Sequence, residues 1–343
     1  MTGPGKILIR ADAGPHIGVG HVMRCLGLAQ AWQERGGQVA YASTTMPDAL
    51  STRLIAEGIK IHTLSAEPAS HLDAELTKTL AESADWLLVD GYNFGSSWLR
   101  RVRGKTRIAL WTDHAHAAEL PVDLILNQNP HASRALYASS AQGARLLLGP
   151  EFVVLRREFR EPLSRRTRRS TLNSILVTFG GGVAAGAHDA FLDAAELLAE
   201  RLPATTLLIS QNHPARDLMF ERAARLPAVT ARLTSDNFTS FVEASDLAVS
   251  AAGATLWELA SLGVPSLALV IAENQEPLAQ HLQSCGAGVS LGQLSNATPT
   301  LIASHIDRLI NHSESLAAMS LAALGLVDGH GSQRVCDALS TSL

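Results

Sequence analysis

The sequence predicts an α/β fold of two doubly wound domains, each a parallel sheet flanked by helices. A length of 343 residues suits two domains of ordinary size better than one. Short, continuously apolar runs alternate with longer Ala/Leu-rich segments of helical period. Continuous rather than alternating apolarity indicates strands covered on both faces, as in parallel sheets. The runs fall into two sets, and each set predicts one sheet.

The first set of runs is KILIRA, QVAYAS, WLLVD, RIALW, DLILN and RLLLG, and the second is SILVTF, TTLLIS, DLAVS and SLALVI. Residues 150–173, between them, carry seven arginines and two prolines and lack the interleaved aromatic platform of a single-strand binder. We interpret the arginine-rich part as a solvated linker. The predicted organisation is a first domain of residues 1–155, a linker of 156–173 and a second domain of 174–343, with the last helix as a candidate for crossing back.

Composition narrows the class of protein. Hydrophobic residues make up 46% of the chain, charged residues 17%, and the net charge is -4, which gives no general attraction to nucleic acid or anionic membranes. Cys25, Cys285 and Cys336 are too widely spaced for a disulfide framework or a zinc cluster. The first residues do not resemble a signal peptide, and no apolar stretch is long enough to span a bilayer. We therefore expect a cytoplasmic protein with no nucleic-acid partner and no membrane span.

The stretch HIGVGHVMR, residues 16–24, places Gly18 and Gly20 directly before a predicted helix of residues 21–35. One explanation is a tight turn, and the other is a backbone that must approach a ligand closely. Loops that follow strands in open α/β sheets face the ligand crevice. We therefore expect both glycines, together with Asp12 at the end of the preceding strand, to contact the substrate.

His21 and Arg24 stand three residues apart, so they share one face of the first helical turn. The unpaired amides and partial positive charge of a helix start disfavour the imidazolium form of a histidine, and a neutral imidazole suits a general base. A histidine that only caps the helix or packs against it is the alternative. We predict that His21 is catalytic and that Arg24 binds substrate.

The second half contains SAAGATLWELASLGVP, residues 250–265, where a strand ends in a loop of small residues and a helix begins. Amides of Gly253 and Ala254 and the hydroxyl of Thr255 are candidates to hold a phosphate. Glu258, one turn into the helix, is a candidate for a sugar diol. Small residues for close packing and a glutamate on a solvated face are the alternative.

Two further loops of the second half are candidate ligand contacts. In TFGGGVAAG, residues 178–186, Gly180 and Gly181 follow a strand, but no acidic residue follows the next strand to hold a ribose, so a nicotinamide dehydrogenase is not expected. A backbone cradle for a nucleotide stays open, and no cofactor is predicted. Asn274 and Gln275 open a later helix, where they would bind sugar hydroxyls or simply cap.

The stretch LLVDGYN places Asp90 and Tyr92 at the carboxyl end of a strand, on the same side of the sheet as His21. The stretch TDHAH supplies Asp113, His114 and His116. Their spacing could serve a metal, but two or three loop residues without a further ligand are usually only a loop. No metal is predicted.

Taken together, several motifs resemble the UDP-sugar hydrolases of pseudaminic acid biosynthesis, from about residue 6 to residue 335. The motifs are R-A-D-A-x-x-x-I-G-x-G-H-V-M-R-C-L-x-L-A, V-D-x-Y, L-I-L-N-Q-N, L-G-P-x-F-x-x-L-R-x-E-F, T-F-G-G and A-x-x-x-L-W-E-L-A-x-L-G-V-P…N-Q. That family cleaves UDP-2,4-diacetamido-2,4,6-trideoxy-β-L-altropyranose to the free sugar and UDP. The resemblance implies the glycosyltransferase B fold, in which two Rossmann-like domains face each other across a cleft.

The resemblance also implies roles for single residues. His21 matches the proposed general base, Tyr92 and Asn274 match active-site residues, and Glu258 matches the residue that holds the ribose in related transferases. The motifs depart from the family at three places: Val183 stands where an aspartate is usual, an Asp-Asp pair is replaced around Asp113, and the loop of residues 14–16 reads G-P-H.

These features predict a hydrolase for which a UDP-sugar is the substrate and UDP a product. Water activated by His21 would attack the anomeric carbon with inversion, while helix-start amides of the second domain hold the diphosphate. A glycosyltransferase, in which His21 deprotonates an acceptor hydroxyl, is the first alternative. A nucleotide-sugar sensor without catalysis is the second.

Overall fold

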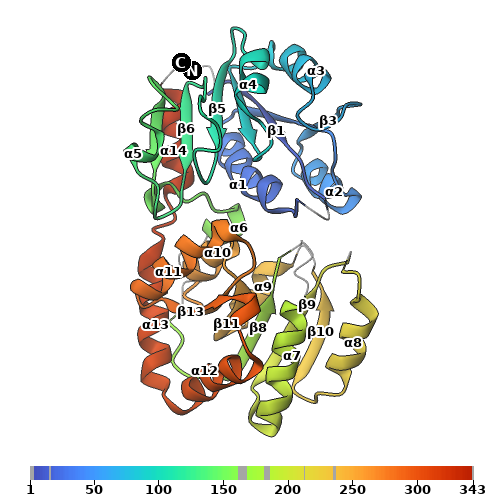
Figure 1. Cartoon of the computed structure of the whole chain (residues 1–343), viewed down its shortest axis with the longest axis vertical. Coiled ribbons are helices and arrows are strands. Elements are labelled where there is room, and N and C mark those ends of the chain that lie inside the picture. Colours follow the sequence, from blue (N-terminus) through green and yellow to red (C-terminus); the bar gives the residue numbers. More distant parts are fainter. Residues whose placement is uncertain are drawn as a thin grey trace. The chain divides into compact units, whose positions relative to one another are not determined.

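The computed structural model describes residues 4–14, 17–160, 168–180, 186–211, 213–234 and 237–341. The chain forms two compact units, shown with their elements in Figure 1. Unit 1 consists of Met1–Arg157 and Gly329–Leu343, and unit 2 of Glu158–Asp328. Unit 1 is therefore built from two segments of the chain that are far apart in sequence.

Unit 1 contains a seven-stranded parallel sheet in the order β3-β2-β1-β4-β5-β6-β7. The order reverses at β1, so the loops after β1 and β4 lie side by side at the carboxyl edge of the sheet. Its strands are β1 (Lys6–Ala11), β2 (Gln38–Ser43), β3 (Lys60–Thr63), β4 (Trp86–Asp90), β5 (Arg107–Trp111), β6 (Leu124–Asn127) and β7 (Arg145–Leu148).

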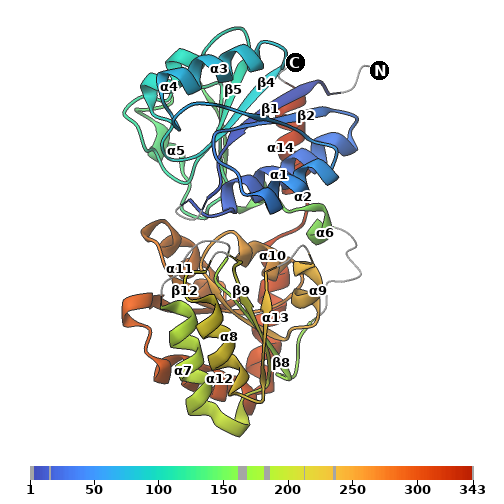
Figure 2. The ribbon, with the colours of Figure 1, turned by 90° about the vertical axis from the view of Figure 1, so that its right-hand side faces the viewer.

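Helices cover both faces of this sheet, as Figure 2 shows. The helices on one face are α1 (Gly20–Glu34), α2 (Asp48–Ala56) and α14 (Gly331–Ser340). Those on the other are α3 (His71–Ala81), α4 (Ser96–Val102) and α5 (Arg134–Tyr137). The apolar positions Val22, Leu26 and Ala29 of α1 are buried against the sheet. The carboxyl-terminal helix α14 is held there by the Trp86 indole, which donates to the Leu339 carbonyl at 3.1 Å.

Unit 2 contains a six-stranded parallel sheet in the order β10-β9-β8-β11-β12-β13. Its strands are β8 (Ser174–Thr178), β9 (Ala204–Ile209), β10 (Val229–Leu233), β11 (Leu247–Ala251), β12 (Ser266–Val270) and β13 (Gly288–Gln293). Its helices are α7 (Ala187–Leu198), α8 (Arg216–Ala224), α9 (Phe238–Glu243), α10 (Thr255–Ser261), α11 (Glu276–Ser284), α12 (Pro299–Asn311) and α13 (Ser313–Leu326). The short helix α6 (Arg157–Arg160) begins the segment that joins the units.

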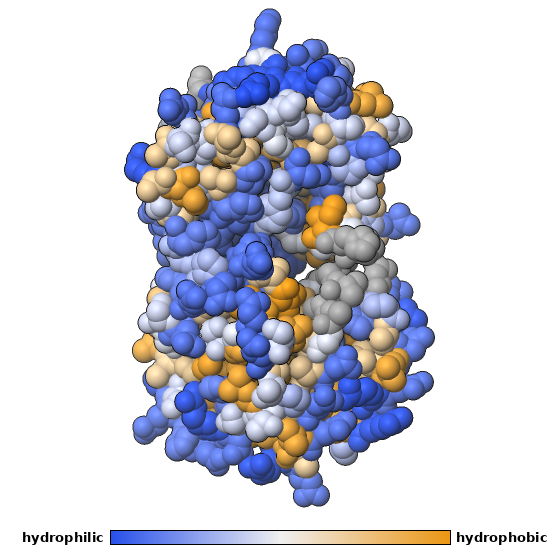
Figure 3. All heavy atoms as spheres, in the orientation of Figure 1, coloured by the Kyte–Doolittle hydropathy of each residue, from blue (hydrophilic) through white to orange (hydrophobic). Residues whose placement is uncertain are grey.

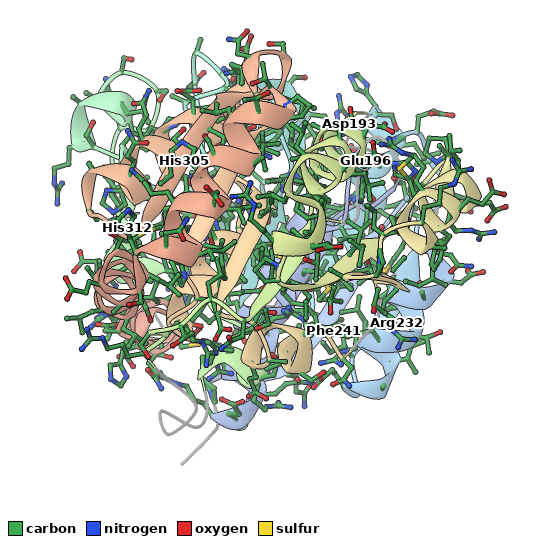
Figure 4. All side chains as sticks on the ribbon, turned by 90° about the horizontal axis from the view of Figure 1, so that it is seen from below. Asp193, Glu196, Arg232, Phe241, His305 and His312 are labelled. Atoms are coloured by element: carbon green, nitrogen blue, oxygen red, sulfur yellow. The ribbon has the colours of Figure 1, made fainter. Side chains whose placement is uncertain are left out.

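Two helices of unit 2 run along one face of its sheet, as Figure 4 shows from below. There α7, which carries the labelled Asp193 and Glu196, lies beside α12. Arg222 links α8 to α7, because it pairs with Asp189 and Asp193 of α7 at 2.7 and 2.5 Å. These ion pairs are exposed to solvent, so apolar packing rather than charge holds this layer in place.

The two-domain parallel α/β fold is as predicted, but the sequence analysis missed the strands β3, β10 and β13. All three lie at sheet edges, where each pairs with only one neighbouring strand. No position of β3, one of β10 and two of β13 are buried, so these strands lack the continuous apolar signal of central strands. The predicted helix of residues 21–35 begins one residue earlier and ends at Glu34.

Hydrophilic residues predominate on the face of the molecule shown in Figure 3, and apolar ones occur in small separate groups. The larger exposed apolar side chains, such as Ile55 and Leu321, lie on different units. Among the described residues, no helix combines the length and the apolarity that a membrane span requires.

Candidate active site

The carboxyl edge of the unit 1 sheet gathers five polar side chains from four segments. His21 and Arg24 lie in the first turns of α1, Asp90 ends β4, Tyr92 follows it, and Asp113 follows β5. Hydrogen bonds join all five into one cluster. The sequence analysis had selected His21, Arg24 and Tyr92, and it had noted the two aspartates without giving them a role.

Asp90 is the centre of the cluster, fully buried at the end of β4. Its Oδ1 accepts from His21 Nδ1 at 2.6 Å and from Arg24 Nη2 at 2.6 Å. Its Oδ2 accepts from Arg24 Nε at 2.7 Å and from the Cys25 thiol at 3.3 Å. Burial by itself raises the pKa of the Asp90 carboxyl, but Arg24 and His21 outweigh burial and hold that pKa well below its ordinary value of 3.8. Asp90 is therefore an ionised carboxylate.

This carboxylate fixes the tautomer of His21. An ionised carboxylate can only accept, so Nδ1 of His21 must carry the proton of the 2.6 Å bond. In the neutral ring, Nε2 is then unprotonated, and it makes no hydrogen bond to any described residue. His21 and Asp90 thus form a dyad in which Nε2 can accept a proton.

The electrostatic setting of His21 differs from the one expected from the helix start alone. The expectation from the helix start rests only on the partial positive charge of the helix, which opposes an imidazolium. The structure places the full negative charge of Asp90 at hydrogen-bond distance from the ring. Since a full charge at 2.6 Å outweighs the half charge of a helix terminus, the carboxylate stabilises the imidazolium that forms when the base takes a proton.

Arg24 holds the two carboxylates of the cluster. Its Nε and Nη2 form a bidentate pair with Asp90, and its Nη1 donates to Asp113 Oδ1 at 3.0 Å. The guanidinium also stacks over the ring of Trp111, 5.0 Å from its centroid. All three guanidinium nitrogens are engaged by protein carboxylates, so the geometry favours a positioning role for Arg24 over the substrate contact that we expected.

Tyr92 lies at the rim of the cluster and is 39% exposed as a residue. Its hydroxyl donates to Asp113 Oδ2. The ring meets His21 edge-on, with centroids 4.9 Å apart, and its other neighbour His114 lies at 5.3 Å. Burial of the hydroxyl end and the negative charge of Asp113 raise the pKa of Tyr92 well above its ordinary value.

Asp12, which we expected to contact substrate, is committed to the fold of unit 1. Its Oδ1 accepts from the Thr44 amide at 2.8 Å and from the Ser43 hydroxyl at 2.9 Å, and its carboxylate pairs with the buried Arg10. Only 5% of Asp12 is exposed. Through Oδ1 it fastens the loop after β2 to the end of β1, and a contact of Asp12 with substrate stays a prediction.

The two glycines before α1 have different explanations. Gly18 has φ +77°, in the left-handed region, and it exchanges two backbone hydrogen bonds with Gly14. A tight turn therefore accounts for Gly18. Gly20 begins α1 with no positive φ, and a Cβ there would meet no described atom within 4 Å. The described part of the fold gives no packing reason for a glycine at position 20, and the close approach of a ligand there stays a prediction.

In unit 2 the structure brings two of the predicted ligand loops together. Gly253 ends the loop after β11, Ala254 and Thr255 begin α10, and Glu258 lies half-buried in its first turn. A Cβ on Gly253 would touch Gln275 Nε2 at an ordinary 3.7 Å, so packing does not require this glycine either.

The second of these loops follows β12. Gln275 Oε1 accepts from the Ile271 amide at 3.0 Å, which closes the loop as a cap. Asn274, beside it, is exposed. Both of the roles considered for Gln275 are therefore compatible with its position, because its Nε2 faces the Gly253 loop while its oxygen caps.

The glycine loop after β8 is described only at its ends. Gly180 has φ +78°, which a side chain would strain. Gly181 and Val183 lie outside the described residues, as do Pro15 and His16 of the first unit. The predictions for these positions therefore stay predictions.

The residues considered for a metal are engaged elsewhere. His116 lies with Nδ1 3.1 Å from the Thr112 hydroxyl and Nε2 3.1 Å from the Phe94 carbonyl, and both oxygens of Asp113 accept protein donors. Within the described part of the chain, no group of three or more His, Cys, Asp or Glu side chains is arranged to hold a metal.

The two parallel α/β units have a fold of the glycosyltransferase B type. Residues 174–335 match the glycosyltransferase family 28 C-terminal domain. Over the whole chain, the protein is similar to the spore coat polysaccharide biosynthesis protein SpsG of Bacillus subtilis, with 22% identity over 331 residues that cover 95% of each chain.

Solved structures share the fold at low sequence identity. MurG of Acinetobacter baumannii superimposes with a TM-score of 0.64 and 17% identity, over 98% of this chain and 99% of that one. The UDP-GlcNAc 2-epimerase of Neisseria meningitidis, solved with UDP-GlcNAc bound, gives 0.68 and 14%, over 97% and 99%. These likenesses concern the fold alone.

Proposed function

We propose that the protein is a UDP-sugar hydrolase that releases free sugar and UDP by inverting attack of water at the anomeric carbon. The observation that carries the proposal is the His21–Asp90 dyad, in which the carboxylate fixes Nδ1 as the donor and leaves Nε2 as the proton acceptor. The match to a glycosyltransferase family 28 domain and the likeness to a UDP-GlcNAc-bound enzyme support a nucleotide sugar as the ligand.

In this mechanism a water molecule donates a proton to His21 Nε2 while its oxygen forms a bond to C1 of the sugar. The bond between C1 and the diphosphate oxygen breaks, and UDP leaves with the electron pair. The His21 imidazolium that results is stabilised by the Asp90 carboxylate, which is not itself protonated. Arg24 carries one positive charge against the two carboxylates that it holds, so the cluster has a net negative charge before the proton arrives.

The nucleotide is assigned to unit 2. The amides of Gly253 and Ala254 and the hydroxyl of Thr255 would contact the diphosphate, and Glu258 would accept from the ribose hydroxyls. The support is local: Gly253 has no folding requirement to be a glycine, and Gln275 Nε2 lies against its loop. Gln275 and its neighbour Asn274 would then bind polar groups of the substrate.

Two further assignments follow from the sequence motifs. Gly180 and Gly181 would extend the contact of unit 2 with the nucleotide, and Gly20 would let the backbone approach the substrate beside His21. The resemblance of the motifs to the pseudaminic acid enzymes makes a UDP-linked diacetamido trideoxy sugar the first substrate to try.

The test is a panel of UDP-sugars incubated with the protein alone and followed by NMR for free sugar and UDP. We expect release without an acceptor, and His21→Asn should lower kcat about 10²–10⁴-fold, the usual range for a lost general base, while UDP affinity is retained. His305→Asn is the matched control, because His305 is a half-buried histidine of α12 (Figure 4) and is no part of the proposed site. Unchanged turnover in a folded His21→Asn variant would remove the base from the mechanism.

A glycosyltransferase is the second candidate, favoured by the match of residues 174–335 to a glycosyltransferase domain. In that reaction Nε2 of His21 would take the proton of an acceptor hydroxyl instead of water. Release of UDP only after an acceptor is added would indicate a glycosyltransferase. Binding of a UDP-sugar with no turnover under either condition would indicate a sensor.

A further inference from the structure

The motif L-I-L-N-Q-N at the end of β6 has no part in the proposed mechanism, yet one of its side chains, Asn129, contacts the active-site cluster, and a second, Asn127, holds Asn129. Asn127 Oδ1 accepts from both the amide and the side-chain nitrogen of Asn129 at 3.0 Å. Asn127 Nδ2 in turn donates to the Tyr137 hydroxyl at 2.8 Å. Asn127 is fully buried and Asn129 is 9% exposed. Asn129 is therefore held in one orientation by its neighbour.

Asn129 in turn fixes the orientation of the Asp113 carboxylate. The second hydrogen of its amide nitrogen goes to Asp113 Oδ1 at 2.7 Å, beside the bond from Arg24. Both donors lie on the same oxygen, so they turn the other oxygen, Oδ2, toward the hydroxyl of Tyr92. Asp113 is only 7% exposed, so solvent does not compete for these bonds.

Tyr92 is consequently tethered at its hydroxyl end, while its ring stays open to solvent. The hydroxyl proton is committed to a buried carboxylate, and burial and the charge of Asp113 raise the pKa of the phenol further. The hydroxyl is therefore poorly suited to transfer a proton. Tyr92 is 39% exposed as a residue, and its ring lies 4.9 Å from the ring of His21, so the ring is the part of Tyr92 that a substrate can reach.

We infer that Tyr92 acts through its ring, as a platform for the apolar face of the sugar beside His21, and that Asp113 and Asn129 are positioning residues that set the platform. The inference rests on the proposed function, because it concerns the sugar of a nucleotide-sugar substrate. Stacking of an aromatic ring on a C–H-rich face needs a fixed ring plane, which the Asn129–Asp113–Tyr92 chain of hydrogen bonds supplies.

The decisive experiment compares variants of the two ends of this chain. Tyr92→Phe, which keeps the ring, should change kcat about threefold or less, whereas Tyr92→Leu should raise KM about 3- to 10-fold, the range for a lost aromatic contact. Asn129→Ala should also raise KM, and the double variant should be no worse than Tyr92→Leu alone, because Asn129 acts through the ring.

The matched control is Gln128→Ala. Gln128 lies in the same motif and is as buried as Asn129, but its oxygen accepts from the Val154 amide at 3.1 Å, away from Asp113. Its loss should affect stability without raising KM. Should Asn129→Ala fail to fold, Asp113→Asn tests the same link, because the shape of the side chain is kept.

An NMR measurement tests the placement independently of activity. The chain has three tyrosines, and Tyr41 and Tyr137 are buried, so the ring signals of the exposed Tyr92 can be identified with ¹³C-labelled tyrosine. Asn129→Ala or Asp113→Asn should shift the Tyr92 signals, whereas Gln128→Ala should leave them in place. If the wild-type protein hydrolysed no UDP-sugar, the proposed function would fail. The inference would still be decided by the Tyr92 signals and by the Kd of UDP-sugars, measured instead of KM.

Three results would overturn the inference. Tyr92→Phe could lose as much kcat as His21→Asn, which would make the hydroxyl a reacting group. The effects of Asn129→Ala and Tyr92→Leu could add in the double variant, which would separate the two residues. Tyr92 signals that do not shift in Asp113→Asn would show that the tether does not set the ring.

Discussion

Replacing Asp90 with asparagine tests the dyad most directly, because it removes one charge and keeps the shape of the side chain. The carboxylate accepts from His21, Arg24 and Cys25 and has no exposed surface. An asparagine amide can donate to His21 Nδ1, and the ring then carries its proton on Nε2, where it cannot act as a base. We therefore expect kcat to fall about 10²–10⁴-fold, the range found when an orienting carboxylate is made neutral.

The same substitution also weakens the fold by an amount that the contacts indicate. Breaking a buried ion pair costs about 3–5 kcal/mol. Arg24 retains its bond to Asp113 at 3.0 Å and its position over Trp111, so we expect the lower end, about 3 kcal/mol. The folded-state pKa of Asp90 lies below 3.8, so its contribution is present above that pH and is lost as the pH falls through the folded-state pKa. The difference in stability between wild type and variant should therefore shrink in acid.

The assay pairs UDP release at neutral pH with urea unfolding at neutral and acidic pH. Asp123→Asn is the control, since Asp123 precedes β6 at the opposite edge of the sheet, where it accepts from the Ile108 amide at 2.8 Å and from Arg103 at 2.9 Å. This control should lose some stability and keep its turnover. An Asp90→Asn protein that folds and turns over at the wild-type rate would refute the role of the carboxylate in fixing His21.

Three further predictions concern the nucleotide, metals and acid stability. Glu258→Ala should weaken UDP binding by about 1–3 kcal/mol, and calorimetry that gives unchanged affinity would remove Glu258 from the site. EDTA should leave turnover unchanged because the nitrogens of His116 and the oxygens of Asp113 are engaged by the protein, and activity that is lost and then restored by a divalent ion would contradict this. His188 of α7 is buried with its pKa lowered from 6.5 to about 4, so the stability of unit 2 should be complete above pH 6.5 and fall by about 3 kcal/mol as the pH drops toward 4. Unfolding of His188→Leu should lack this decline, and an equal decline in the variant would assign it to other groups.

The sequence was sufficient for the central strands and for the loops that follow them. Strands such as β1 and β4 carry three or four consecutive apolar residues because helices cover both faces of the sheet, and this signal is local. Edge strands such as β10 have one open side, so they carry no such signal and were missed. The spacing of three residues between His21 and Arg24 likewise placed both on one helix face before the structure was known.

Sequence reasoning could also propose that the ends of β1 and β4 lie on one side of a sheet, but it could not pair the side chains there. His21 and Asp90 are 69 residues apart, and their contact depends on β4 lying next to β1, which the strand order decides. The order likewise brings Asp113 of the β5 loop to Arg24 and Tyr92. By contrast, Asp12 looked equally suitable in sequence, yet it turns toward the β2 loop.

What the sequence determined by itself is therefore the class of fold, the loops at the carboxyl ends of the strands and the candidate base His21 in the first turn of a helix. What only the tertiary structure decided is which partners those side chains have. A hydrogen bond depends on distances of a few tenths of an ångström between atoms on different strands, and no local pattern records them. The tautomer of His21, the buried role of Arg24 and the outward ring of Tyr92 all depend on such contacts.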